Sequence, residues 1–238
     1  MAQTVLKLKP RPQTESGRYD VYAQIHKGLR SFMADTLLRV GRLDAADELE
    51  LAEGAAQLRG LLALCRAHLE HENDFMHTAM EARRPGSAAQ AAGEHVHHLH
   101  SIESLEAELR ALERSEGEAR AAPALELYRS LALFVAENLE HMHYEETAHN
   151  EVLWEAYEDA ELEAIERALV ASVAPEEMAA VARWMLPAMT APDRAARLAA
   201  MRTAMPPQAF AATLAMLKAQ LSERDWYKLG AALGPDAV

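Results

Sequence analysis

The sequence predicts an all-α protein: an antiparallel up-down four-helix bundle followed by a C-terminal helical extension. Apolar residues recur at helical spacing along nearly the whole chain, and no segment shows the alternation typical of a strand. Alanine and leucine dominate a composition that is only 5% aromatic, and both residue types favour helices. Glycine and proline, ten residues of each, lie mostly at the expected element boundaries.

Four long helices are expected between residues 18 and 160. They are predicted over approximately 19–40, 44–84, 87–115 and 123–157. Gly41 ends the first, and Asp44 is the expected N-cap of the second. Pro85 and the glycine after it break the chain before the third, and Pro123 opens the fourth. Short connections make consecutive helices antiparallel neighbours.

The remaining residues, 161–238, have a different character. Shorter helical segments are separated there by Pro175, Pro187, Pro192 and the Pro206-Pro207 pair. We expect a helical extension that packs on the bundle rather than an independent catalytic domain. A contact that forms a homodimer through this extension is an open alternative.

Charge and composition exclude several classes of partner. A formal net charge of −13 repels phosphate backbones, so no nucleic-acid partner is expected. The chain has no stretch near the roughly 20 apolar residues that span a membrane, and its first residues do not resemble a signal peptide. The single cysteine, Cys65, fits a reducing compartment. These features predict a cytoplasmic protein that does not associate with membranes.

Histidine and glutamate pairs on two of the helices suggest a metal site. His68 and Glu72 are four residues apart on the second helix, and His141 and Glu145 repeat this spacing on the fourth. Residues at this spacing project from one helix face, and both pairs lie on stripes of apolar residues. Burying them is costly unless they are paired or coordinate a metal. Glu146 is an alternative to Glu145.

The third helix carries EHVHHLH, residues 94–100, with four histidines. The leucines that follow set the helical phase, which turns His95 and His98 inward. The same phase leaves His97 and His100 at the flank or toward solvent. This stretch is therefore expected to contribute one side of a site that several helices build.

Helix lengths allow the levels of these residues to be compared. At about 1.5 Å per residue, His26 on the first helix lies about 22 Å from the end of that helix. His68 reaches the same level only if the second helix restarts near Gly54, which predicts a separate turn or short helix over 44–53. The same comparison of levels favours His98 over His95 on the third helix.

Taken together, these residues resemble the hemerythrin-like family of HHE cation-binding domains. The resemblance rests on IHKGLR, HLEHENDF, GEHVHHLH and HMHYEE followed by LWEAYEDAEL, and it covers approximately residues 18–160. It implies a four-helix bundle with two iron ions in its core, forming an Fe–O–Fe type of centre. Histidines would be terminal ligands and two carboxylates would bridge the ions. The residues carried over are His26, His68, Glu72, His95, His98, His141, Glu145 and Glu146.

The third helix departs from the pattern of the oxygen-carrying members. Those members have two histidines four residues apart, whereas here the residues at that spacing are Glu94 and His98, and His95 is three from His98. The resemblance therefore points toward members associated with iron handling, nitric-oxide response or repair of iron–sulfur clusters. The expected small ligand is dioxygen, nitric oxide or peroxide.

Two other functions remain open from the sequence. One is a metal-free helical interaction module that retains polar core residues. The other is a di-iron oxidase or peroxidase, although a metal- and ligand-binding protein is favoured over an enzyme. Imidazole and carboxylate ligands suit iron, and they also suit manganese or zinc.

Overall fold

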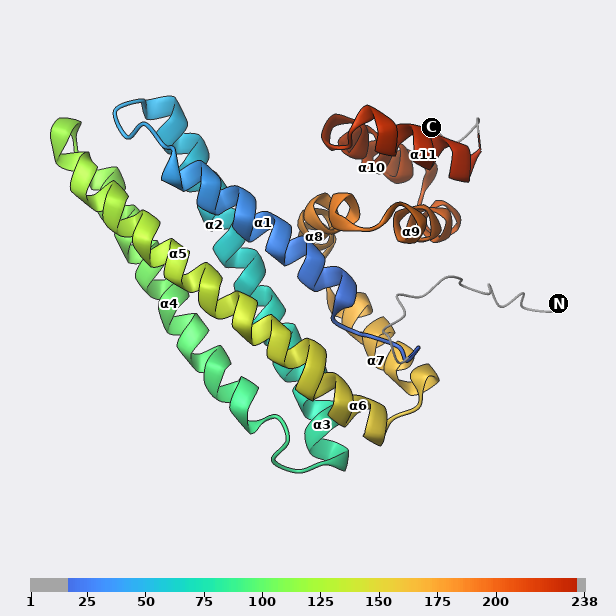
Figure 1. Cartoon of the computed structure of the whole chain (residues 1–238). Helices are drawn as coiled ribbons and strands as arrows, with labels where there is room; N and C mark the ends of the chain where they lie inside the picture. Colours follow the sequence, from blue (N-terminus) through green and yellow to red (C-terminus); the bar gives the residue numbers. More distant parts are fainter. Residues whose placement is uncertain (1–16, 235–238) are drawn as a thin grey trace.

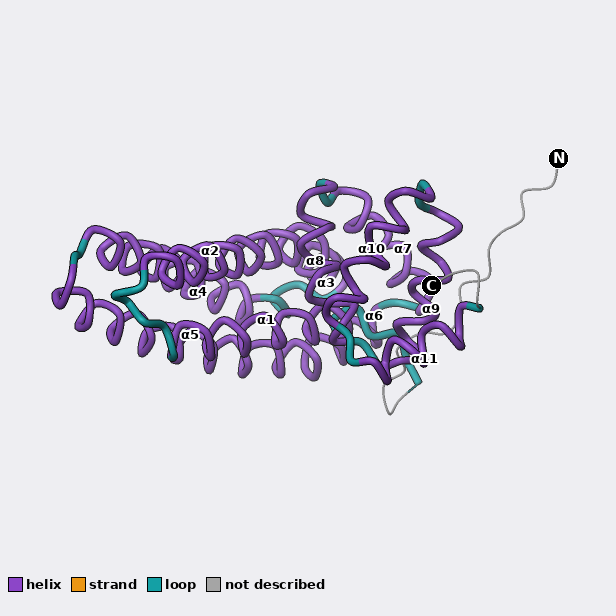
Figure 2. Tube along the Cα trace, turned by 90° about the horizontal axis from the view of Figure 1, so that it is seen from above, coloured by secondary structure: helices purple, strands orange, loops and turns teal. Residues whose placement is uncertain are grey.

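The computed structural model describes residues 17–234, and within that range it contains helices and no strand (Figure 2). The predicted all-α class is therefore confirmed. None of the described helices has the length and apolar composition needed to cross a membrane.

The first part of the chain forms four long helical runs. Their elements are α1 (Ala23–Gly41), α2 (Glu48–His71), π-helix η1 (Glu72–His77), α3 (Thr78–Arg83), α4 (Ala89–Arg114), 3₁₀-helix η2 (Gly117–Arg120), α5 (Ala121–Tyr144), π-helix η3 (Glu145–His149) and α6 (Asn150–Ala156). The π-helices do not end a helix, since α2–η1–α3 and α5–η3–α6 are each continuous. The long runs are thus α1, α2–η1–α3, α4 and α5–η3–α6.

These runs lie side by side, and successive runs point in opposite directions (Figure 1). Contacts join α1 to α2, α2 to α4, α4 to α5, and α5 back to α1. Each run therefore has two neighbours and one face toward a common interior. Leucines dominate that interior on the side of the α1–α2 connection, among them Leu58, Leu61, Leu62, Leu105, Leu112 and Leu131.

The α1–α2 connection differs from the expectation. Asp47, not Asp44, caps α2, and its side chain accepts hydrogen bonds from two backbone N–H groups of the first turn. The predicted break over 44–53 is wrong, because α2 runs without interruption past Gly54. A Cβ at Gly54 would lie 3.3 Å from Leu43 Cδ1, so the connection packs beside this glycine. The first turns of α2 therefore extend beyond the end of α1.

The rest of the chain forms shorter helices. They are α7 (Asp159–Ser172), α8 (Pro175–Ala188), α9 (Ala191–Ala204), α10 (Pro207–Gln220) and α11 (Glu223–Leu233). Several begin with the sequence signals of a helix start: α8, α9 and α10 have a proline in their first turn, and Thr190 and Ser222 cap α9 and α11 with their hydroxyl groups. These helices make the total number larger than the sequence suggested.

The extension contacts the long runs mainly through α8, which packs along α1 (Figure 1). The two helices approach so closely that a Cβ on Gly28 would lie 2.9 Å from the Cα of Met185. One turn further along α1, the ring of Phe32 stacks on Trp184 with centroids 4.0 Å apart. Beyond α8, a separate apolar cluster that includes Leu186, Leu198 and Leu217 holds the shorter helices together.

Candidate metal centre

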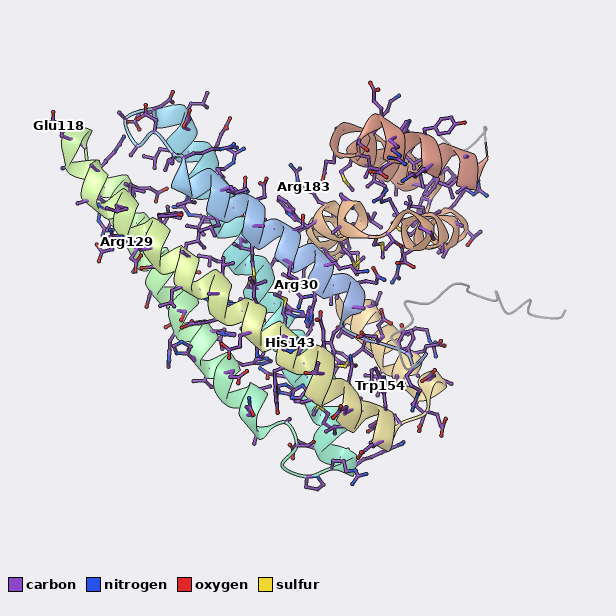
Figure 3. The ribbon with its side chains drawn as sticks, viewed as in Figure 1. Arg30, Glu118, Arg129, His143, Trp154 and Arg183 are labelled. Atoms are coloured by element: carbon purple, nitrogen blue, oxygen red, sulfur yellow. The ribbon has the colours of Figure 1, made fainter. Side chains whose placement is uncertain are left out.

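Side chains from all four long runs converge at one level of the interior. One group consists of His26, His68, Glu72 and Glu145, and a second consists of Glu72, His95, His141 and Glu145. Within each group, one potential ligand atom per residue lies within 4.8 Å of all the others. Both groups contain the same two carboxylates. Arg30 on α1 and His143 on α5 mark this level along the long runs (Figure 3).

The two carboxylates are buried and have no hydrogen-bond partner. Glu72 is 2% exposed and Glu145 is completely buried, and all four of their side-chain oxygens lack a hydrogen bond. Leaving a buried polar atom unpaired costs about 1–3 kcal/mol, and more when the group is charged. Four buried carboxylate oxygens without a hydrogen bond are therefore suited to binding a cation.

Histidine nitrogens surround these oxygens at short range. His68 Nε2 lies 3.1 Å from Glu72 Oε1, and His141 Nε2 lies 3.3 Å from Glu145 Oε1. His26 Nε2 is 3.6 Å from Glu72 Oε1 and 3.5 Å from Glu145 Oε2. His95 Nε2 is 3.6 Å from an oxygen of each carboxylate. Each carboxylate therefore faces histidines of both groups.

Hydrogen bonds on the outer side of three rings fix the orientation of these histidines. Nδ1 of His26 lies 3.1 Å from Glu146 Oε1, and Nδ1 of His141 lies 2.7 Å from Glu94 Oε2. His95 Nδ1 is 2.9 Å from Asn73 Oδ1. All three partners are acceptors, so Nδ1 carries the proton and donates. In the neutral ring, Nε2 then presents a lone pair to the interior, as metal-ligating histidines do.

The contact between His95 and His141 shows a consequence of these Nδ1 hydrogen bonds. Their Nε2 atoms are 3.0 Å apart, yet both rings already donate from Nδ1. Two neutral rings in this state direct lone pairs at each other and cannot form a hydrogen bond. A cation bound by both nitrogens, or a proton on one of them, removes the conflict.

Protonation shifts agree with this reading of the site. Burial lowers the pKa of His26, but Glu146, Glu72 and Glu145 outweigh that effect and raise it to about 9. The pKa of His141 is likewise raised to about 9, because Glu145, Glu94 and Glu72 overcome the effect of burial. Burial and Glu72 act to raise the pKa of Glu145, yet His141 and His95 lower it to about 2. Without metal, protons supply the positive charge that the two carboxylates require.

Two further histidines, His77 and His149, lie beside Glu145 and form a third group with it. Both are buried, and the Nε2 atom of each lacks a hydrogen-bond partner. On a regular α-helix His77 would lie off the inward face, because it is five residues from Glu72. In a π-helix the repeating bond joins residues five apart, so η1 returns His77 to the inward side. The sequence has the order His, Glu, His in both α2–η1 and α5–η3. This repeated order was the signal that could have identified His77 and His149 as further residues of the site.

His98 lies outside all three groups, although helix lengths favoured it over His95. Its ring is buried between Phe134 and His141, one turn from the site, and burial together with His141 and His95 lowers its pKa to about 4. The comparison of helix lengths is valid only if the end of each helix lies at the same level as the start of the next. Glu72 is about 16 Å from the end of α3 and His95 about 9 Å from the start of α4, so these ends differ in level by about 7 Å.

Glu146 is likewise outside the groups. Arg30 donates to its two oxygens at 2.6 and 2.9 Å, and Oε1 also faces His26. Burial would raise the pKa of this carboxyl, but His26 and Arg30 lower it to about 2. Glu146 therefore orients His26. Asn73 has the corresponding position and role for His95, and both residues directly follow a shared carboxylate.

Two other residues, Tyr22 and Cys65, lie near the site. Tyr22 is 2% exposed, its ring stacks on His26, and its hydroxyl lies 3.4 Å from His149 Nδ1. Burial, with Glu145 and Glu72, raises the pKa of its phenol. Cys65 is buried in the leucine core one turn before His68, and burial raises its pKa to about 12. The thiol belongs to none of the three groups.

Comparisons with protein-family models, with curated proteins and with solved structures find no match to this chain. The function of this chain is therefore inferred from the residues of the site itself. Its buried histidine and glutamate side chains can hold a metal ion, because the donor atoms converge, lack other partners and are oriented from behind.

Proposed function

We propose that this chain is a hemerythrin-like protein: a four-helix bundle that binds two iron ions and through them binds or senses a small ligand, or handles iron. One observation carries the proposal. Two histidine-containing groups share both Glu72 and Glu145, and each carboxylate has two oxygens directed toward different histidines. Carboxylates in that position are suited to bridge two ions.

The donor set favours a transition metal that is intermediate between hard, oxygen-preferring ions and soft, thiolate-preferring ions. Imidazole with carboxylate suits iron, manganese and zinc, and the absence of sulfur argues against a thiolate-preferring ion. Iron, when bound, would supply reversible redox chemistry and could take dioxygen, nitric oxide or peroxide as a ligand. Only His95 of the α4 histidines joins a group, which favours a sensing or iron-handling role over oxygen transport.

The surrounding residues give the site its environment. The leucine core closes one end of it, and Tyr22, Met76, Met80 and Leu153 form an apolar cluster at the other. These side chains exclude water and lower the local polarity, which strengthens charge interactions at the site. Tyr22 is positioned to donate a hydrogen bond from its hydroxyl to a neighbouring acceptor, since that oxygen is buried beside His149.

Metal analysis tests the proposal. Purified protein reconstituted anaerobically with ferrous iron should contain close to two irons per chain and show near-ultraviolet charge-transfer absorption. His68→Ala and His141→Ala should each remove at least one iron, because each deletes a donor from one group. His143→Ala is the matched control: this exposed histidine on α5 belongs to no group, so iron content should not change.

Failure to bind stoichiometric iron, manganese or zinc under these conditions would overturn the proposal and favour a metal-free interaction module. Spectra of the reduced iron protein, exposed separately to dioxygen and to nitric oxide, then distinguish the ligands. A stable change with either gas supports binding or sensing. Repeated turnover of peroxide or ferrous iron would instead indicate an oxidase or peroxidase.

A further inference from the structure

A cavity of about 160 Å³ lies beside the metal centre, between α1, α2 and η1 on one side and α7 and α8 on the other. Its walls are mostly apolar and include Ile25, Leu64, Met76, Leu169, Val181 and Met185. His68 and Glu72 also line it. An apolar cavity of about 150 Å³ is large enough to bind a benzene-sized molecule. The space is therefore suited to a small organic ligand.

Gln24, on the first turn of α1, supplies the polar feature of this cavity. Its side chain lines the cavity and is only 7% exposed, yet neither Oε1 nor Nε2 has a hydrogen-bond partner. A buried amide without partners costs about 1–3 kcal/mol, and an alanine or leucine would avoid that cost. A buried amide without partners on the wall of a mostly apolar cavity is typical of a group that orients a ligand.

Apart from His68 and Glu72, which belong to the candidate metal centre, the charged residues around the cavity are already compensated. Asp20 accepts hydrogen bonds from the backbone N–H groups of Tyr22 and Ala23. Glu177 pairs with His71 at 2.8 Å, and Arg197 lies 4.0 Å from Glu166. No cation of this lining is left over for an anionic ligand, and the carboxylates would repel one. The cavity therefore favours a ligand without charge.

We propose that this cavity binds an uncharged, mainly apolar molecule about the size of a single aromatic ring, with an amide or hydroxyl group that hydrogen-bonds to Gln24. The proposal goes beyond metal binding and does not depend on it, because the apolar walls and Gln24 are formed by protein side chains alone. A ligand in this position would lie next to His68 and Glu72, at the edge of the metal centre.

Calorimetric titration of the full chain with benzamide tests the proposal, with benzoate and toluene as comparison probes. We use protein kept metal-free by chelator, so that the outcome is independent of iron binding. Benzamide should bind, toluene should bind more weakly, and benzoate should bind at least tenfold more weakly than benzamide. Methyl signals of Met76, Met178 and Met185, which line the cavity, should shift on binding, whereas that of Met142 in the leucine core should not.

Two variants locate the ligand. Gln24→Leu should weaken benzamide about tenfold and leave toluene unchanged or tighter, while the exposed Gln90→Leu should alter neither. Val181→Trp should block all probes by filling the cavity, with circular dichroism establishing that it is folded. Absence of benzamide binding at its solubility limit would overturn the proposal. Unchanged benzamide affinity in Gln24→Leu would overturn the assigned role of the amide.

Discussion

Two histidines of the candidate centre are oriented by polar side chains from other long runs, and each of these side chains directly follows a shared carboxylate in the sequence. Asn73 follows Glu72 and orients His95, Glu146 follows Glu145 and orients His26. Such outer partners commonly change metal affinity by 10- to 100-fold when mutated. A metal site of this kind therefore depends on residues that supply no ligand atom.

The structure separates His95 from His98, which the sequence could not do. His95→Ala should lower iron content to one ion or less, because His95 belongs to a group that shares both carboxylates. His98→Ala removes a ring that packs on Phe134 and His141, so it should lower thermal stability while retaining both irons. Metal analysis with thermal denaturation measures both effects. Loss of iron in His98→Ala and not in His95→Ala would contradict the assignment.

At the scale of the elements, the two π-helices are the features that build the site. Each begins with a shared carboxylate, Glu72 in η1 and Glu145 in η3, and each ends with an additional buried histidine. A π-turn accommodates one extra residue and changes the direction of the side chains within it. In η1 the wider turn thus brings His77, five residues from Glu72, to the same side as that carboxylate.

Deleting one residue from η3 tests this role. Removal of Thr147, which is exposed, should convert η3 to regular α-helix while keeping α5 and α6 in phase. We expect far-ultraviolet circular dichroism to be nearly unchanged and iron content to fall by at least half, because Glu145 and His149 are displaced relative to each other. Thr147→Ala, which keeps the chain length, should bind iron normally. Full iron content in the deletion variant would contradict a role for the π-turn.

Much of this element structure followed from the sequence, and the exceptions have physical causes. Apolar periodicity identified the long runs, and the repeated His-x-x-x-Glu spacing identified the residues that α2–η1 and α5–η3 contribute to the first two groups, but not His77 and His149 of the third group. His77 was missed because periodicity assumes a constant 3.6 residues per turn. His98 was favoured wrongly because the end of α3 and the start of α4 do not lie at the same level. Both errors concern offsets that only three-dimensional packing determines.

For the whole molecule, the extension is more than a cover for the long runs. Helices α7 and α8 provide one wall of the cavity beside the candidate metal centre, and α8 is held to α1 by backbone approach at Gly28 and ring stacking at Phe32. The sequence predicted the packing of this extension without indicating a cavity. That feature depends on the gap between two packed layers of helices, which periodicity does not report.

Gly28 provides the test at this scale. Gly28→Ala should lower the free energy of unfolding by about 1–3 kcal/mol, because its Cβ would lie 2.9 Å from the Met185 backbone and force α8 away. Gly60→Ala is the matched control, since its Cβ would meet only Phe32 Cζ at 3.5 Å. Alanine there should stabilise the helix by up to about 1 kcal/mol. Denaturant unfolding measures both changes, and equal effects would contradict the close approach.

The way in which the two halves orient each other's histidines has a consequence for assembly. The ring of His26 on α1 is oriented by Glu146 on η3. The ring of His95 on α4 is oriented by Asn73 on η1. The runs α1 and α2–η1–α3 contain no complete donor set, and neither do the runs α4 and α5–η3–α6. If the chain were cut in the loop around Gly86, each fragment would hold only part of every donor set. Reassociation of the fragments and capture of the ions would then be a single event.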